Sequence, residues 1–138
     1  MYLLDTNVVS ELRRPRPHGA VVAWLASIDA ADLFLSAVTI GEIQVGIEIT
    51  RGQDPVKAAA IEAWLERVVE SSNILAMDSR AFRVWAKLMH RRSDHLIEDA
   101  MIAATAVVHQ LTVVTRNGRD LDQFGVRTLD PFEAPPTA

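Results

Sequence analysis

The chain has 138 residues, of which 49% are hydrophobic and 23% are charged, and it contains no cysteine. This length is typical of one domain, and the lack of cysteine excludes a disulfide scaffold, a thiolate metal site and a cysteine nucleophile. Because 18 Asp and Glu residues against 14 Lys and Arg residues give a net charge of -4, the field of the whole molecule does not attract nucleic acid, and any such contact must be local.

Short apolar runs alternate with longer helical patterns along the chain, which is typical of βα units around a parallel sheet. The predicted strands are Tyr2–Leu4, Leu33–Ser36, Ile74–Met77, Thr112–Thr115 and Val126–Leu129. The predicted helices are Ala20–Ser27, Thr39–Ile49, Pro55–Glu70, Ser79–Arg91 and Glu98–Gln110. We therefore expect an α/β domain.

One domain is expected over residues 1–133, followed by a Pro-rich C-terminal tail over residues 134–138. The first residues lack the positive start of a signal peptide, and Asp5 interrupts what would be its apolar core. The longest apolar stretch, Ala100–Val108, is far shorter than the ~20 residues of a membrane span. These features predict a cytoplasmic protein with no membrane contact.

Acidic residues occur where an open parallel sheet binds its ligands, at the carboxyl ends of the strands. Asp5 directly follows the first predicted strand, and Glu42 lies in the helix after the second. Asp99 begins the helix before the fourth strand, and Asp120 follows that strand. Four carboxylates at one edge repel each other unless cations compensate, and all-oxygen ligands suit Mg²⁺ or Mn²⁺.

Each of these acids also fits a purely structural role, and the sequence leaves that alternative open. Asp5 suits the N-cap of a following helix, and Thr39 with Glu42 matches a capping box. Asp99 suits the positive end of a helix dipole. The segment Asn117–Asp120 suits a turn. The case for a site rests on all four acids falling at one edge.

Four segments resemble the four motifs of PIN-domain ribonucleases, in order and at similar spacings. These segments are Leu3–Val9, Ser36–Glu42, Glu98–Ala106 and Val114–Leu121. The resemblance spans nearly the whole chain. It is greatest to the VapC toxins of bacterial toxin-antitoxin pairs, in the FitB-like branch, where the opening continues into a segment similar to Ser10–Pro15.

The resemblance implies a three-layer α/β/α fold with a short, mainly parallel sheet of four to five strands, and the activity of a magnesium-dependent endoribonuclease. Its catalytic and metal-binding acids map onto Asp5, Glu42, Asp99 and Asp120. Family members carry the fourth acid at the place of Asn117 or of Asp120, and we assign it to Asp120. The supporting polar residues are Thr6, Asn7, Thr115 and Asn117. Mg²⁺, or Mn²⁺ in its place, would activate the water that attacks phosphorus.

Arginines near these acids are candidates for binding RNA phosphates, because a guanidinium pairs with phosphate oxygens through two hydrogen bonds. Arg13 and Arg14 follow the first acid closely, and Arg116 and Arg119 bracket the fourth. A solvated charged face, or ion pairs with a protein partner, is the alternative. The pair Arg91–Arg92 closes a predicted helix, where positive charge favours the helix dipole.

The resemblance also implies an RNA substrate, a cognate VapB-like antitoxin, a homodimer, a higher hetero-oligomer with the antitoxin, and DNA contact only through the antitoxin. Two surfaces are candidates for antitoxin binding, the Arg-rich mouth of the acidic site and an apolar helix stripe. The stripe comprises Ile61, Trp64, Leu65 and Val68. Ordinary core packing is the alternative for this stripe.

Three rival functions were weighed. A magnesium-dependent phosphatase or phosphoacceptor would need a second Asp where Asn7 stands, or a Lys where Arg116 stands. A binding module of the same fold without activity would have lost acids that are present here. A housekeeping RNA-processing nuclease differs from a toxin in its targets, and the small single-domain chain favours the toxin.

Overall fold

Residues 1–133 are described by a computed structural model, and the predicted tail, residues 134–138, lies outside the described residues. Five strands form one sheet in the order β3-β2-β1-β4-β5, and all four pairings are parallel. The strands are β1 (Tyr2–Leu4), β2 (Leu33–Ser36), β3 (Asn73–Leu75), β4 (Thr112–Val114) and β5 (Thr128–Leu129). Their carboxyl ends therefore share one edge, the carboxyl edge.

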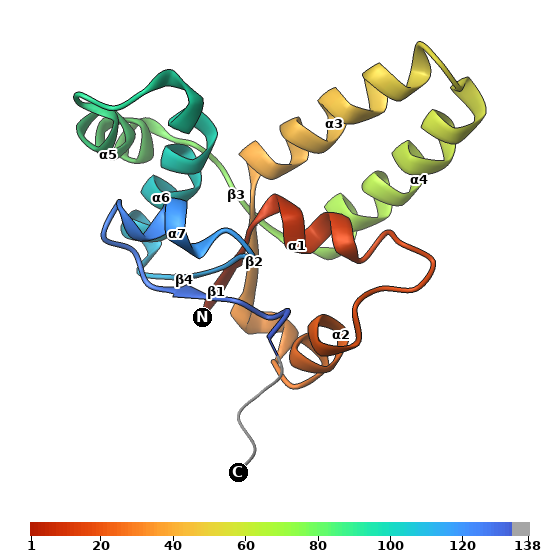
Figure 1. The fold of residues 1–138 in the computed structure, drawn as a ribbon, viewed down its shortest axis with the longest axis horizontal. Helices are drawn as coiled ribbons and strands as arrows, with labels where there is room; N and C mark the ends of the chain where they lie inside the picture. Colours follow the sequence, from red (N-terminus) through yellow and green to blue (C-terminus); the bar gives the residue numbers. More distant parts are fainter. Residues whose placement is uncertain (134–138) are drawn as a thin grey trace.

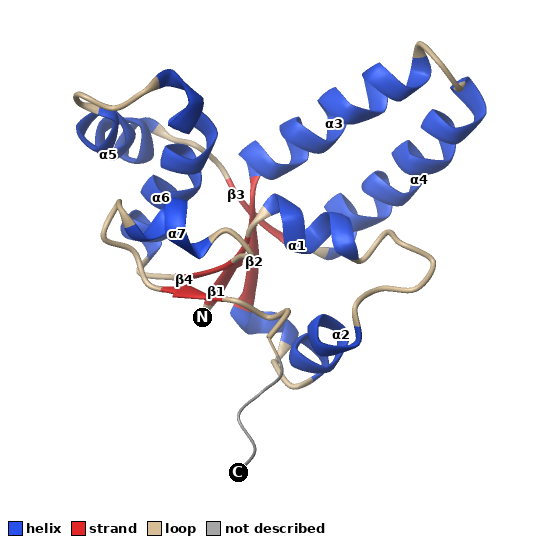
Figure 2. Cartoon of the chain, in the orientation of Figure 1, coloured by secondary structure: helices blue, strands red, loops and turns tan. Residues whose placement is uncertain are grey.

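Seven helices accompany the sheet in the described part of the chain (Figures 1 and 2). They are α1 (Thr6–Glu11), α2 (Gly19–Ala26), α3 (Ala37–Arg51), α4 (Pro55–Ser71), α5 (Ser79–Met89), α6 (Ile97–His109) and α7 (Gly118–Asp122). Two 3₁₀ turns, η1 (Ala30–Asp32) and η2 (Asp94–Leu96), precede β2 and α6. No helix among residues 1–133 combines the length and the apolar character that crossing a membrane requires.

Neighbouring residues of one strand pack into opposite layers, because side chains alternate across a sheet. Leu3 packs with Ile102 of α6 and Leu121 of α7. Leu4 packs with Val8 of α1 and Val21 of α2. The sheet is therefore covered on both faces, and the predicted three-layer α/β/α architecture is confirmed.

The α3–α4 hairpin extends away from the sheet (Figure 1) and carries a small core of its own. Ile47 of α3 packs with Ala58 and Leu65 of α4. Arg51 joins the two helices, with nitrogen atoms 3.0 Å from a carboxylate oxygen of Glu48 and 3.0 Å from one of Glu62. The hairpin is thus held by packing and by internally paired charges.

Helix α6 runs from the carboxyl edge to the opposite edge and ends in a sharp turn. Its C-cap, Gln110, has a φ of 56° in the left-handed region, and the N–H of Leu111 donates to the carbonyl of Ala106 at 2.9 Å. Such a cap closes a helix abruptly. Thr112 therefore begins β4 only two residues after Gln110.

Some predicted boundaries were wrong for local reasons. Helix α3 begins at Ala37, before the predicted Thr39, because the Ser36 hydroxyl accepts the N–H of Val38 at 3.1 Å and caps the helix. Strand β3 is displaced to Asn73–Leu75. Helix α1 was anticipated only as the helix that Asp5 could cap, and α7 was missed, since six and five residues are too few to show a helical period.

Candidate active site

Asp5 is buried at the end of β1, and each of its carboxylate oxygens accepts a hydrogen bond. Oδ1 accepts the N–H of Thr6 at 2.8 Å and caps α1, while Oδ2 accepts the hydroxyl of Thr115 at 2.9 Å. Burial raises the pKa of Asp5, and these two hydrogen bonds oppose the rise. The capping alternative therefore accounts for Oδ1 of Asp5, whereas Oδ2 is held by Thr115, the residue directly after β4.

Glu42 is not part of a capping box, because Ser36 rather than Thr39 caps α3. Instead, Oε1 of Glu42 accepts the hydroxyl of Thr6 at 2.9 Å, and the Thr6 hydroxyl lies 3.0 Å from that of Thr39, which is fully buried. When Glu42 is ionised it can only accept, so Thr6 donates to Glu42 and Thr39 donates to Thr6. Burial raises the pKa of Glu42, the Thr6 bond lowers it, and the charge of Asp5 raises it further.

Asp99 lies half-buried in the first turn of α6, a helix with no side-chain cap. Burial is the largest cause that raises its pKa, to about 6, followed by the charges of Asp5, Asp120 and Glu98. The charge of His95, one helical turn earlier, opposes the rise. Asp99 is thus close enough to the other acids to feel their charge.

The segment Asn117–Asp120 forms the start of α7, so the turn alternative was wrong. The side-chain amide of Asn117 donates to Oδ2 of Asp120 at 2.9 Å. The amide and the carboxylate are therefore direct neighbours, and Asp120 is the acid of the pair.

Thr115 connects these parts through a hydroxyl that uses its full hydrogen-bonding capacity. It donates to Asp5 and accepts from the Asn7 side-chain amide at 3.2 Å and from the backbone N–H of Asn117 at 2.9 Å. Oδ1 of Asn7 in turn accepts the N–H of Arg116 at 3.2 Å. The structure thus brings all four predicted supporting residues against the acids.

We call the five carboxylates at this edge the acidic edge; they are Asp5, Glu42, Glu98, Asp99 and Asp120. Their oxygen donors suit Mg²⁺ or Mn²⁺, and their mutual repulsion is what a bound cation relieves. Among residues 1–133, no three Asp, Glu or His side chains gather closely enough to ligate one ion together. Mg²⁺ is commonly held by one or two carboxylates and its own waters, which this arrangement fits.

The predicted phosphate-binding arginines differ in their surroundings. Arg14 lies 3.7 Å from the buried Glu11, and the Arg116 guanidinium stacks on Phe132, 3.5 Å from the ring centroid. Arg13 and Arg119 are exposed, and no ion pair is formed by either within the described residues. Arg13 and Arg119 are therefore the freer of the four to meet a phosphate.

Two residues near the site were missed as members of it. Thr39 was considered only as a cap, and Glu98 only as a neighbour of Asp99. His95 was predicted to be structural or at the surface, and its side chain is exposed, while its charge opposes the rise in the pKa of Asp99.

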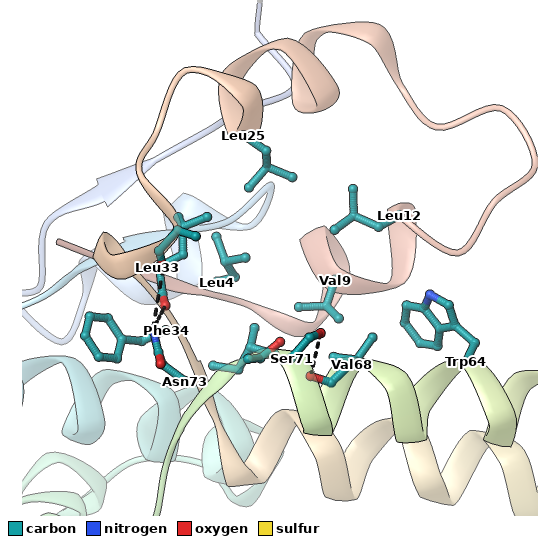
Figure 3. Close-up of a pocket in the computed structure, with 13 residues that line it drawn as sticks. Leu4, Val9, Leu12, Leu25, Leu33, Phe34, Trp64, Val68, Ser71 and Asn73 are labelled. Carbon is teal, nitrogen blue, oxygen red and sulfur yellow. Dashed lines mark hydrogen bonds between the residues drawn. The ribbon is translucent and has the colours of Figure 1, made fainter.

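The predicted apolar stripe of α4 divides between core and surface. Leu65 is buried in the hairpin core, whereas Trp64 and Val68 line a pocket of 340 Å³. Figure 3 shows Val9 of α1, Leu12 directly after that helix and Leu25 of α2 facing the same space. Ile61, Trp64 and Val68 are half-buried and also pack against the core clusters. The core interpretation is therefore correct for Leu65 and holds in part for the other three, while Trp64 and Val68 also line the pocket.

Comparison with known proteins relates both the fold and the site to one family. The PIN domain model matches residues 2–126. Toxin FitB of Neisseria gonorrhoeae is 34% identical over 139 residues, covering 96% of this chain and 99% of that protein. VapC ribonuclease Y4jK of Sinorhizobium fredii is 34% identical, with the same coverage of both chains.

Solved structures agree with the sequence comparison. The crystal structure of FitAcB from Neisseria gonorrhoeae superposes with a TM-score of 0.84 at 34% identity, covering 96% of this chain and 99% of that one. A structure of FitAB bound to the IR36 DNA fragment gives the same TM-score at 31% identity, with 98% of both chains covered.

Proposed function

Because the chain belongs to the PIN-domain family, we propose that it is a divalent-metal-dependent endoribonuclease and the toxin of a type II toxin-antitoxin pair. The observation that carries the proposal is the acidic edge. Asp99, with a pKa raised to about 6 by burial and by neighbouring carboxylates, belongs to a group whose repulsion a cation offsets. The similarity of the chain to a VapC ribonuclease, over nearly the full length of both proteins, supports RNA as the substrate.

Asp5 and Asp99 are the carboxylates proposed to hold Mg²⁺, or Mn²⁺, with Glu42 and Asp120 beside them. When bound there, the cation would supply a nucleophilic water at neutral pH and would neutralise charge on the phosphate. The residues of the chain fix the geometry: Thr115 holds one oxygen of Asp5, and Thr6 holds Glu42. Glu42, which the Thr6 hydroxyl holds and whose pKa is raised by burial, is our candidate for the base that would accept the proton of the attacking water.

The same contacts disfavour a phosphoacceptor. Both oxygens of Asp5 accept hydrogen bonds, and Asn7, where a second Asp would be needed, uses its amide on Thr115 and on the backbone of Arg116. A housekeeping role is disfavoured by the similarity over nearly the full length to toxin FitB.

The proposed partners are a VapB-like antitoxin and a second copy of the chain, in a hetero-oligomer that meets DNA through the antitoxin and works in the cytoplasm. The pocket of Figure 3 suits an amphipathic antitoxin segment, because apolar side chains from α1, α2 and α4 line it. Trp64→Asp should abolish antitoxin binding while cleavage persists. Val69→Asp is the matched control, since Val69 is 41% exposed on the same helix and does not line this pocket.

The decisive experiment uses the purified chain freed of antitoxin and total cellular RNA, with the cleaved ends mapped. Cleavage at defined sites is expected with Mg²⁺ or Mn²⁺ and none in excess chelator. Full activity in chelator would refute the metal-dependent mechanism. Undiminished activity after coexpression with the product of a neighbouring reading frame would remove that product as its antitoxin.

A further inference from the structure

Residues 79–93 carry an unusual concentration of positive charge for an acidic protein. This segment contains five of the 14 Lys and Arg residues and no Asp or Glu. The five are Arg80, Arg83, Lys87, Arg91 and Arg92. Like charges this close repel each other, and the segment itself contains no acid to pair with them.

Three of these five cations belong to helix α5 and lie on the face opposite its buried side. Ala81 is buried, and Trp85 and Leu88 pack against Leu96 and Ala100 at the start of α6. The spacing i, i+3, i+7 places the three cations of α5 together on the other face, spread over about 10 Å of helix. We call these three residues the α5 basic face; they are Arg80, Arg83 and Lys87.

The α5 basic face is exposed and unpaired. All three of its side chains are exposed, and within residues 1–133 none of them lies within ion-pair distance of a carboxylate. Arg51 offers the contrast, because it is paired with Glu48 and Glu62 on a different helix pair. Three unpaired cations are therefore free to meet an anionic partner.

Contacts at both sides of the α5–α6 turn place this helix beside the acidic edge. The indole N–H of Trp85 donates to the carbonyl of Ile97, two residues before Asp99, at 3.2 Å. Arg92 donates to the side chain and the carbonyl of Gln123 at 2.8 and 3.1 Å, and the Gln123 amide donates to the carbonyl of Asp120 at 2.8 Å. Arg92 therefore joins this turn to Gln123, the C-cap residue of α7. The pair Arg91–Arg92 was predicted to close a helix, but α5 ends earlier, at Met89.

The topology agrees with these contacts. Strand β3 ends at the carboxyl edge only four residues before α5 begins, and α6 starts from that edge with Asp99 in its first turn. Figure 1 shows α5 lying outside α6, on the α7 side of the molecule. The α5 basic face thus belongs to the same end of the molecule as the acids.

An acidic edge repels the phosphates of its own substrate, so cations elsewhere on the surface are needed for affinity in addition to the exposed Arg13 and Arg119. We propose that the α5 basic face binds backbone phosphates of the RNA beside the scissile bond, an inference that rests on the proposed ribonuclease function. Phosphate contacts position a strand without reading its sequence. The α5 basic face therefore lowers KM and leaves kcat and the choice of cleavage site unchanged.

The test measures RNA binding without cleavage. The triple variant Arg80→Gln, Arg83→Gln, Lys87→Gln is compared with the control Lys57→Gln, Arg67→Gln, Arg127→Gln. The control removes the same charge from three exposed residues with no ion pair within residues 1–133. The probe is a fluorescein-labelled single-stranded RNA of mixed sequence, in chelator, followed by anisotropy between about 50 and 200 mM salt.

The triple variant should bind at least about tenfold more weakly than wild type, and the slope of log K against log salt should fall by about 2, since each single-strand phosphate contact contributes about 0.7. The control variant should keep the wild-type slope. Replacing Arg80 and Arg83 by Lys should keep it too, because the charge remains. In Mg²⁺, the triple variant should cleave with raised KM and unchanged kcat.

Equal slopes for the triple and control variants would overturn the inference. So would a triple variant that binds RNA normally but no longer binds antitoxin, since the α5 basic face would then be a protein interface. A wild-type protein that fails to cleave RNA with Mg²⁺, yet binds it in chelator through the α5 basic face, would refute the proposed function and support the α5 basic face.

Discussion

The acidic edge and the α5 basic face both gather like charges at one end of the molecule, but they are built differently. The carboxylates of Asp5 and Glu42 are held by hydroxyls of Thr115 and Thr6, which come from other parts of the chain. The cations of the α5 basic face project into solvent with no ion-pair partner within residues 1–133.

This difference separates two tasks of a nuclease. Fixed carboxylates hold reacting groups within a narrow geometry, which affects the rate of the chemical step. Cations on flexible stems attract phosphate over a Debye length and tolerate many strand positions. Changes at the acidic edge should therefore act on kcat, and changes at the α5 basic face on KM and its salt dependence.

The largest effect is expected from Asp5→Asn. It should lower kcat by more than about a hundredfold, since loss even of a residue that only orients a metal ligand typically costs 10- to 100-fold. RNA binding in chelator should stay at the wild-type level or become tighter. Asp54→Asn is the matched control, because Asp54 also caps a helix, α4, far from the acids. Because Asn caps a helix as well as Asp does, wild-type activity in both variants would show that Asp5 acts as a cap alone.

A smaller effect on the same step is expected from Thr39→Val. Thr39 is fully buried and donates to the hydroxyl that holds Glu42. Val keeps the shape and removes one hydrogen bond, at a cost of about 1 kcal/mol of unfolding free energy, and we expect kcat to fall by about tenfold with KM unchanged. Thr39→Ser should restore most of the activity. A Ser variant as slow as the Val variant would show that packing, and not the hydroxyl, matters here.

The metal-free protein should lose stability as the pH rises from about 4 to about 6. Burial and neighbouring carboxylates raise the pKa of Asp99 from 3.8 to about 6. The folded state therefore binds more protons than the unfolded state in this interval, so the free energy of unfolding falls with rising pH and stays lower above it. The Tm measured in chelator checks this, and Asp99→Asn should flatten the profile. A Tm that rises across the interval in chelator would contradict the proposed repulsion.

The smallest effect is expected where charges are already paired. Arg51→Gln removes the exposed ion pairs of the α3–α4 hairpin and should lower the Tm slightly, because such pairs contribute little. The salt dependence of RNA binding should not change. A slope reduced as much as in the α5 triple variant would show that net charge, and not its location, governs RNA binding.

The fold around the proposed site could be predicted because the apolar runs of its strands are visible in the sequence, and β1 and β2 were predicted with their observed bounds. Asp5 directly follows β1, and Asp99 stands in the first turn of a helix whose apolar pattern is also visible. Whether these acids act as proposed is for the experiments above to decide.

Other features could not be predicted, because they depend on residues far apart in the chain. Thr6 meets Thr39 and Glu42 across more than 30 residues, so no local pattern distinguishes this contact from a capping box. The charges of α5 are plain in the sequence. That α5 packs beside the start of α6 and is followed by a turn joined to Gln123 is shown only by the contacts of Trp85 and Arg92.

The abrupt end of α6 at Gln110 has a consequence for how such a chain tolerates insertions and deletions. Asp99 lies at one end of the uninterrupted helix α6 and β4 follows its other end. Only Gln110, in the left-handed turn, and Leu111 connect α6 to Thr112. Removing one residue from the middle of α6 would rotate Asp99 by about 100° relative to β4 and draw it back by about 1.5 Å. Substitutions along α6 therefore leave Asp99 aimed at the acidic edge, whereas a change of length by one residue turns it away.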